Sequence, residues 1–132
     1  VGPVDDLARR VVRRPDTTDR LVLDKAYAPG LADLDGFSHV VVLAHLDGVE
    51  EHRLTARPPH VDDREVGVFA SRSPLRPNPI AQTVVELVDR VDERLRVRGL
   101  DLVDGTPVLD LKPHVPAVED SEEVSLGWLD EI

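Results

Sequence analysis

The chain contains no cysteine and no methionine, and aromatic residues make up only 3% of its 132 residues. The absence of cysteine excludes disulfides, thiolate metal ligands and a cysteine nucleophile. The apolar residues, 41% of the chain, are mostly valine, leucine and alanine. Because β-branched side chains fit a pleated surface, a valine-rich core favours strands. The length suits one domain with one core, and we assign residues 1–132 to it.

Long apolar runs and targeting segments are also missing. No run of apolar residues is long enough to cross a bilayer, and no signal peptide is visible. We therefore expect a soluble, cytoplasmic protein that does not act at a membrane. The chain does not begin with methionine, so we expect it to start after processing or within a longer gene.

Lysine is scarce in a strongly acidic chain. Asp and Glu number 26 against 16 Lys and Arg, which gives a net charge of −10, and only Lys25 and Lys112 are lysines. This composition is typical of proteins that work in high salt, where screening reduces self-repulsion, and we predict a halophilic source. A merely acidic mesophilic protein is the alternative. The charge also disfavours nucleic acid as a partner unless the arginines gather on one face.

Several signature motifs are absent. The spacing of the histidines matches no zinc signature, so we assign no metal site. A G-x-G-x-x-G motif and a P-loop are both lacking, which removes the Rossmann and phosphate-cradle interpretations. A G-x-S-x-G motif is lacking too, so Ser71 and Ser73 are poor candidates for a hydrolytic nucleophile.

The apolar pattern predicts several short strands. Phe37–Leu46 contains an unbroken valine run, which indicates a strand buried on both faces. Arg94–Gly99 alternates, with arginines on the outer face, and we prefer a strand to a helix for Ala81–Val91. Shorter strands are expected at Arg20–Asp24 and Glu65–Ala70. A hairpin is expected at Asp104-Gly105, between Leu100–Val103 and Val108–Leu111.

The remaining segments are predicted to be helical or irregular. Asp5–Arg14 is interpreted as a short helix with a basic patch or, alternatively, as a loosely ordered arm. Ala28–Gly36 is rich in turn residues, and Gly48–Asp63 is expected to be a mobile loop. Ser121 is expected to cap a final helix that contains Leu126 and Trp128. Together these patterns predict a mainly β domain, a barrel or a sandwich, with short peripheral helices.

Gly67–Ile80 reads Gly-Val-Phe-Ala-Ser-Arg-Ser-Pro-Leu-Arg-Pro-Asn-Pro-Ile and is the most informative stretch. We name Ser71–Pro79 the proline loop. Its prolines restrain the backbone, so polar groups can be held in place before a ligand arrives. Guanidinium groups suit carboxylates, phosphates and aromatic faces. Composition alone leaves a structural loop and a ligand site equally open.

A second stretch, Gly99–Pro116, combines the Asp104-Gly105 turn with another proline-rich end. Together with Gly67–Ile80 and Gly36-Phe37-Ser38-His39, it resembles the TsaA-like, or TrmO, family over about Leu31–Pro116. The resemblance implies a single-domain β-barrel that binds S-adenosylmethionine. It also implies methylation of N6 of threonylcarbamoyladenosine at position 37 of certain tRNAs. The alternatives are a methyltransferase of a small molecule and a non-catalytic binding or assembly module.

The resemblance also implies which residues bind the cofactor. These are Arg72, Gly99, Leu100, Asp101 and Leu102, with Gln82 as a weaker match and either His45 or Asp47 at the end of the Phe37 strand. Arg76 and Asn78 are assigned to loop architecture or to the substrate side. No catalytic residue is assigned, because methyl transfer from a sulfonium depends mainly on positioning.

The chain departs from the family pattern in two places. Val1–Thr18 has no clear Ser-Pro, and Arg13-Arg14-Pro15 is only a weak counterpart of a second family segment. The chain ends soon after Pro116, so we expect it to lack the extra C-terminal domain of longer members.

We expect a homodimer. We expect tRNA as the partner, and we expect it to contact the row of Arg94, Arg96 and Arg98 and the Arg9–Arg14 patch.

Overall fold

The computed structural model describes residues 11–13, 18–58, 64–119 and 124–131. These residues form two compact units. The first unit contains the described residues up to Glu50 together with Asn78–His114. The second contains Glu51–Pro77 together with the described residues from Val115 onward.

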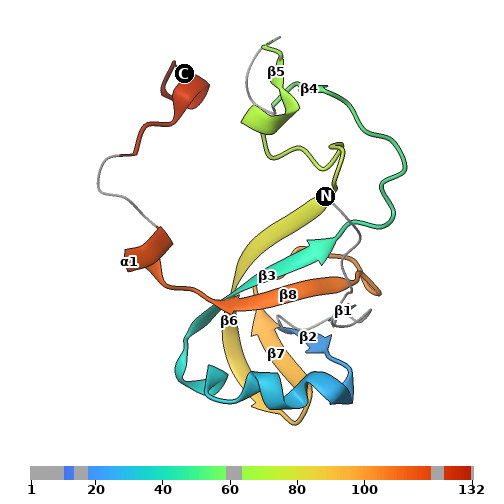
Figure 1. Cartoon of the computed structure of the whole chain (residues 1–132), viewed down its shortest axis with the longest axis vertical. Helices are drawn as coiled ribbons and strands as arrows, with labels where there is room; N and C mark the ends of the chain where they lie inside the picture. Colours follow the sequence, from blue (N-terminus) through green and yellow to red (C-terminus); the bar gives the residue numbers. More distant parts are fainter. Residues whose placement is uncertain (1–10, 14–17, 59–63, 120–123, 132) are drawn as a thin grey trace. The chain divides into compact units, whose positions relative to one another are not determined.

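The first unit is built on one antiparallel sheet (Figure 1). Its strand order is β1-β2-β7-β6-β3-β8, with the bounds β1 Val11–Arg13, β2 Thr18–Val22, β3 His39–His45, β6 Ile80–Val91, β7 Arg94–Arg98 and β8 Val108–Pro113. The helical elements of this unit are two short 3-10 helices, η1 (Lys25–Leu31) and η2 (Leu34–Gly36). The mainly β prediction with short peripheral helices is therefore confirmed.

Strand β3 lies between β6 and β8 and pairs with both. Its pairing with β6 runs without a break from His39 opposite Glu86 to His45 opposite Ile80. Val40, Val41 and Val42 are all buried, at 0%, 5% and 0% exposure. The buried strand predicted from the valine run is confirmed, because a strand paired on both edges and covered on both faces needs no polar alternation.

Strand β6 bends the sheet around the core. Its first half pairs with β3 and its second half with β7, and the register shifts between Leu87 and Asp89. An extra residue at such a bulge increases the local twist and bends the strand. The strand predicted for Ala81–Val91 is confirmed, and the tight turn after it holds Asp92 at φ 54°.

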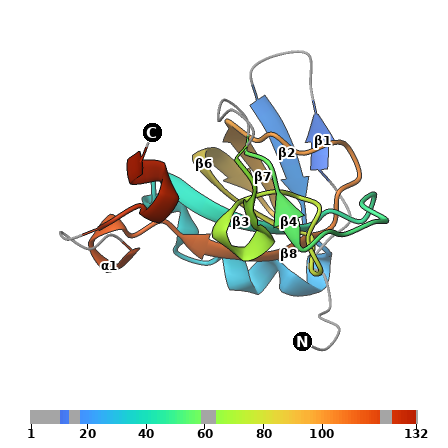
Figure 2. The same cartoon turned by 90° about the horizontal axis from the view of Figure 1, so that it is seen from above.

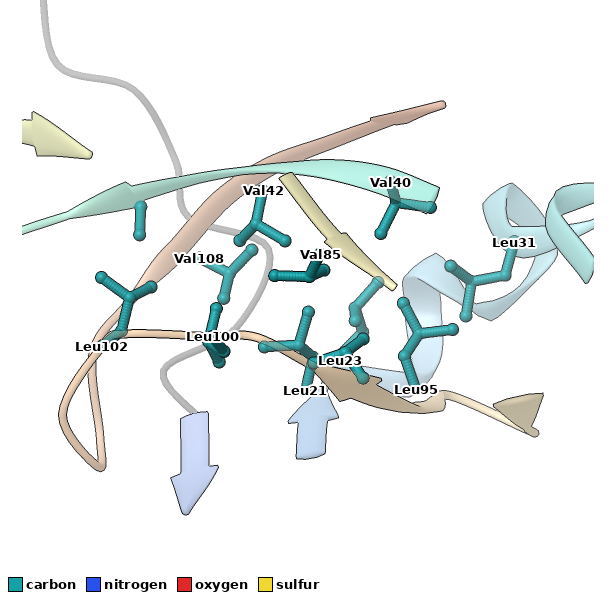
Figure 3. Close-up of a cluster of buried hydrophobic side chains, with 12 residues drawn as sticks. Leu21, Leu23, Leu31, Val40, Val42, Val85, Leu95, Leu100, Leu102 and Val108 are labelled. Atoms are coloured by element: carbon teal, nitrogen blue, oxygen red, sulfur yellow. The ribbon is translucent and has the colours of Figure 1, made fainter. Parts of the chain in front are cut away.

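The hydrophobic core lies inside the curved sheet (Figure 3). Side chains of β3, such as Val40 and Val42, point toward Leu21 of β2 and Leu95 of β7. The buried cluster consists of Leu21, Leu23, Leu31, Val40, Val42, Ala44, Val85, Leu95, Val97, Leu100, Leu102 and Val108. It contains no aromatic side chain, so valine and leucine provide its packing, as the composition indicated.

The alternation predicted for Arg94–Gly99 is also confirmed. Leu95 and Val97 are completely buried, while Arg94, Arg96 and Arg98 are exposed on the other face. The predicted turn-rich segment Ala28–Gly36 falls largely within η1 and η2, and Leu31 of η1 packs into the core.

The hairpin predicted around Asp104-Gly105 is wrong. A turn is present there, with Thr106 Oγ1 donating to the Val103 carbonyl at 2.7 Å, but Leu100–Val103 forms no strand. Instead β8 pairs with β3. Leu100 and Leu102 each bury their side chains in the core, at 4% exposure. Strand β8 therefore pairs with the edge of β3, which is distant in sequence, and not with the nearby segment Leu100–Val103.

The helix predicted for Asp5–Arg14 is wrong where it can be compared. Val11–Arg13 forms β1, which pairs with β2 from Val11 opposite Leu21 to Arg13 opposite Asp19 (Figure 2). Two consecutive β-branched residues favour a strand once a sheet edge is available. Residues 5–10 and Arg14 lie outside the described part of the chain.

The second unit contains little regular structure. Strands β4 (Thr55–Ala56) and β5 (Val66–Gly67) pair, and three short helices follow: the 3-10 helix η3 (Val68–Ala70), α1 (Pro116–Glu119) and the 3-10 helix η4 (Gly127–Glu131). The strand predicted for Glu65–Ala70 is wrong beyond Gly67, because the Ser71 N–H bonds to the Val68 carbonyl and closes a 3-10 turn. The predicted final helix is confirmed for Trp128, which lies in η4, but Leu126 lies before the first residue of that helix. Ser121, the predicted cap, lies outside the described residues.

The valine core can be tested with two neighbours on β6. Val85 is 1% exposed and faces the core, while Val84, on the opposite face, is 42% exposed. We expect Val85→Ala to lower the free energy of unfolding by about 2 kcal/mol, through lost burial and a residual cavity. Val84→Ala should change it by less than about 0.5 kcal/mol. Urea unfolding measures both values, and equal losses would contradict this assignment of faces.

Candidate functional site

Serine hydroxyl groups hold the start of the proline loop. Ser71 Oγ donates to the Val68 carbonyl at 2.9 Å and accepts the Ser73 N–H at 3.3 Å. Ser73 Oγ accepts the Leu75 N–H at 3.2 Å. Such side-chain turns replace the backbone bonds that a proline-rich segment cannot make. The loop is thus shaped by its own residues.

Arg76 ties the loop from within. Its Nη1 donates to the Ser71 carbonyl at 3.0 Å and to the Ser73 carbonyl at 3.3 Å. These bonds favour loop architecture, one of the two roles predicted for Arg76. Asn78, the other residue with this assignment, has an exposed side chain, and its carbonyl accepts the Ile80 N–H at 2.8 Å.

A pocket of about 1030 Å³ lies in the second unit, beside the proline loop. Ser71, Arg72, Ser73, Pro74 and Leu75 form one wall of this pocket. Arg72 is exposed, whereas Arg76 is directed to the loop carbonyls. The volume is at the upper end of what small-ligand sites offer. Arg72, the residue predicted first for cofactor binding, is therefore positioned at a ligand-sized pocket.

The charges along the pocket are unusual for this protein. Among the residues that the structure describes, three arginines line it, Arg53, Arg57 and Arg72, and one carboxylate does, Glu65. Arg53 is partly neutralised, because its Nη2 lies 3.0 Å from Glu51 Oε1. In a chain with a net charge of −10, this local excess of guanidinium groups favours an anionic group on a ligand.

The C-terminal segment forms another wall, through Trp128 and Leu129. Trp128 Nε1 donates to the Ala70 carbonyl at 2.7 Å, next to the proline loop in sequence. Arg64 Nη1 lies 2.6 Å from Glu131 Oε2, and the Arg64 guanidinium lies 5.9 Å from the centre of the Trp128 ring. The sequence predicted a helix that contains Trp128 but did not assign this residue to a site. The one feature of the sequence that could have pointed to a functional role is that Trp128 is the sole tryptophan.

The other predicted cofactor residues belong to the first unit, where Gly99–Leu102 follows β7. Gly99 has φ +94°, which favours glycine, and both Gly99 and Asp101 are exposed. Leu100 and Leu102 are core residues, at 4% exposure each. Their side chains therefore stabilise the fold, which leaves the backbone and Asp101 as the groups of this segment that could meet a ligand.

His45 and Gln82 are brought together on one face of the sheet. His45, the last residue of β3, lies opposite Ile80, and Gln82 lies two residues further along β6. This diagonal relation places both side chains on the face opposite Val40 and Val42. Both are exposed. Asp47, the alternative to His45, is exposed in the turn that follows, and its N–H bonds to the His45 carbonyl.

The described part of the chain contains no group of three or more metal-ligating side chains. His39 and His114 meet edge to face, with their ring centres 6.5 Å apart, and Ser38 Oγ lies 2.8 Å from His39 Nδ1. His60 lies outside the described residues. Among the described helices, none is long and apolar enough to pass through a bilayer.

The predicted arginine row is balanced by carboxylates. Arg96 pairs with Asp89 on the adjacent strand, and Arg98 Nη1 lies 3.2 Å from Glu86 Oε2. Arg94 Nε lies 3.7 Å from Glu93 Oε1. Two arginines of this row therefore pair across strands and the third with its neighbour in sequence, which leaves less free positive charge for RNA than the sequence implied. The Arg9–Arg14 patch lies outside the described residues, apart from the backbone of Val11–Arg13.

A family model described as the tRNA-methyltransferase O N-terminal domain matches residues 6–120. An S-adenosyl-L-methionine-binding protein of Archaeoglobus fulgidus is 38% identical over 112 residues, covering 85% of this chain and 80% of that protein. The tRNA (adenine(37)-N6)-methyltransferase of Escherichia coli (strain K12) is 40% identical over 108 residues, covering 76% of this chain. A crystal structure of TrmO superimposes with a TM-score of 0.73 at 30% identity, covering 96% of this chain and 61% of that one.

The chain spans only part of several relatives. The match covers 46% of the Escherichia coli enzyme. It covers 28% of a second Archaeoglobus fulgidus protein, a probable S-adenosyl-L-methionine-binding protein that is 46% identical over 105 residues.

The role of Arg76 can be tested directly. Arg76→Ala removes both bonds to the loop carbonyls, so the loop should open more often. We expect the Ser73 and Leu75 amide protons to exchange with solvent about tenfold faster, as the loss of roughly 1.4 kcal/mol of local stability implies. Arg98→Ala, which removes an arginine of the first unit paired with Glu86, is the control and should leave both amides unchanged. Unchanged exchange in Arg76→Ala would contradict the role.

Proposed function

The chain belongs to the family of the tRNA-methyltransferase O N-terminal domain, and on this premise we propose that it is an S-adenosylmethionine-dependent tRNA methyltransferase. We propose N6 of adenosine 37 as the acceptor atom and, more finely, the threonylcarbamoylated form of that adenosine. One observation carries the proposal: the proline loop is already shaped and has Arg72 at a ligand-sized pocket. The names of the relatives support both the donor and the acceptor.

The residues present fit the methyl donor chemically. Arg72 offers a guanidinium for a carboxylate, and Phe69 and Leu75 in the same pocket offer apolar surface for a purine ring. In the first unit, taken by itself, the Asp101 carboxylate can accept hydrogen bonds from hydroxyl or amino groups, and the polar side chains of His45 and Gln82 are exposed. Gly99, Asp101, His45 and Gln82 stay predictions as donor contacts.

The chemistry asks little of the protein beyond placement. When bound, S-adenosylmethionine supplies an activated methyl group on a sulfonium. The residues of this chain bind and orient, so most of their contribution is positional. Serine turns and the Arg76 bonds fix the loop in advance, which reduces the entropy lost when a ligand binds. Such a site needs no covalent catalytic residue.

A homodimer and a cytoplasmic location stay predictions from the sequence.

Donor binding tests the first half of the proposal. We expect isothermal titration calorimetry to show binding of S-adenosylmethionine, and Arg72→Ala to weaken it by about tenfold or more, because a charge-assisted hydrogen bond is lost. Arg94→Ala, an exposed arginine of β7, is the control and should bind as the unaltered protein does. Both variants should keep the circular dichroism spectrum of a folded chain. Absence of donor binding at low and at high salt would overturn the proposal.

The acceptor needs a separate experiment. Nucleosides from the tRNA of a strain lacking the gene, compared by mass spectrometry with those of the parent strain, should lose the N6-methylated adenosine derivative. Restoring the unaltered gene should restore it, and the Arg72→Ala gene should restore less. If the tRNA nucleosides are identical while the purified protein still binds the donor, the acceptor is another molecule, and the tRNA half of the proposal is wrong.

A further inference from the structure

Trp128 lines the pocket although it lies outside residues 6–120, the part that the family model matches. It is the sole tryptophan of a chain with very few aromatic residues. A second aromatic side chain, Phe69, lines the same pocket and is 76% exposed. Large exposed aromatic surface in a pocket is costly in water unless a ligand covers it.

The indole is held in a fixed orientation. Its Nε1–H donates to the Ala70 carbonyl at 2.7 Å, and the Arg64 guanidinium lies 5.9 Å from its ring centre. Arg64 is itself paired with Glu131 at 2.6 Å, and the Leu126 N–H bonds to Asp130 Oδ2 at 2.8 Å. The segment 126–131 is therefore tied both to itself and to the residues that precede the proline loop. A ring fixed in this way loses little entropy when a ligand packs against it.

Aromatic rings beside guanidinium groups are the surface that suits nucleotides. Rings stack on the face of a base, and cations bind the carboxylate or phosphate attached to the nucleoside. Here Trp128 and Phe69 supply the rings, and Arg57 and Arg72 supply positive charge. In an otherwise acidic chain, this combination favours a ligand that has both a planar ring and an anionic group over a purely apolar one.

We propose that Trp128 is a ligand-contacting residue whose indole packs against the base of an adenosine that carries an anionic group. The inference rests on the proposed function, which supplies two sources of this chemistry. One is the methyl donor, an adenosine with a carboxylate. The other is a nucleotide of tRNA, an adenosine with a phosphate. In either case the C-terminal segment completes the pocket and takes part in recognition.

Fluorescence tests the inference, since all tryptophan emission comes from this one side chain. The full chain is titrated with S-adenosylmethionine, with adenosine 5′-monophosphate and with an RNA hairpin that displays an adenosine in its loop. We expect at least one probe to quench or shift the emission saturably. A response to the donor alone identifies the donor, and a response to the hairpin and the monophosphate identifies the acceptor nucleotide.

Variants separate a contact with the ligand from a purely structural role. Trp128→Ala should weaken binding of the responding probe by about tenfold, the loss expected for one base–aromatic stack. Trp128→Phe keeps a ring but lacks the N–H that bonds to Ala70, and it should bind within about threefold of the unaltered protein, since a neutral hydrogen bond contributes little. Leu126→Ala, 53% exposed in the same segment and not at the pocket, is the control. Equal losses in the Ala and Phe variants would show that Trp128 only positions Ala70, and would overturn the inference.

Calorimetry of donor binding distinguishes a failure of this inference from a failure of the proposed function. If the donor binds calorimetrically while no probe alters the emission and Trp128→Ala binds normally, the inference is wrong and the function stands. If the donor does not bind while the monophosphate or the hairpin still quenches through Trp128, the function is wrong and the inference stands. If no probe binds by either method, both are wrong.

Discussion

The first unit depends on the double pairing of β3, which hydrogen-bonds to β6 on one edge and to β8 on the other. Because both edges are used, the backbone polar groups of an almost wholly apolar strand are satisfied inside the sheet. The bulge in β6 then turns the sheet around the side chains of β3. The described core cluster, which has no aromatic residue, is closed in this way by valine, leucine and Ala44.

The second unit uses a different principle, since its short strands and helices supply few backbone bonds. Serine hydroxyls, Arg76 and the Trp128 N–H bond to backbone groups instead. The proline-rich segment is thereby rigid without being regular, which suits a surface that receives a ligand. Arginines pair with carboxylates in both units, those of β7 in the first and Arg53 and Arg64 in the second. Arg53, Arg57 and Arg72 line the pocket of the second unit.

Two of the strands that the sequence predicted well have an unambiguous pattern. Val40–Val42 belongs to an unbroken apolar run, and Leu95 and Val97 belong to a strict alternation. The hairpin at Asp104-Gly105 failed because the turn residues specify a reversal but not the partner of the strand that follows. The four-residue spacing of Leu7 and Val11 predicts a helix for Asp5–Arg14, with a loosely ordered arm as the alternative. The edge of β2 instead decides the conformation of Val11–Arg13.

For the candidate site, the sequence by itself determined the motifs, and through them the family and a polar loop stiffened by prolines and containing Arg72 and Arg76. It did not distinguish the two arginines by geometry, since both are cations on one loop. Tertiary structure did, because the Ser71 and Ser73 carbonyls accept from Arg76 while Arg72 lies at the pocket. It likewise assigned the side chains of Leu100 and Leu102 to the core and brought Trp128 to Ala70 across 58 residues. The burial of Leu100 and Leu102 and the bond of Trp128 depend on where distant segments meet in space, which local pattern and propensity do not encode.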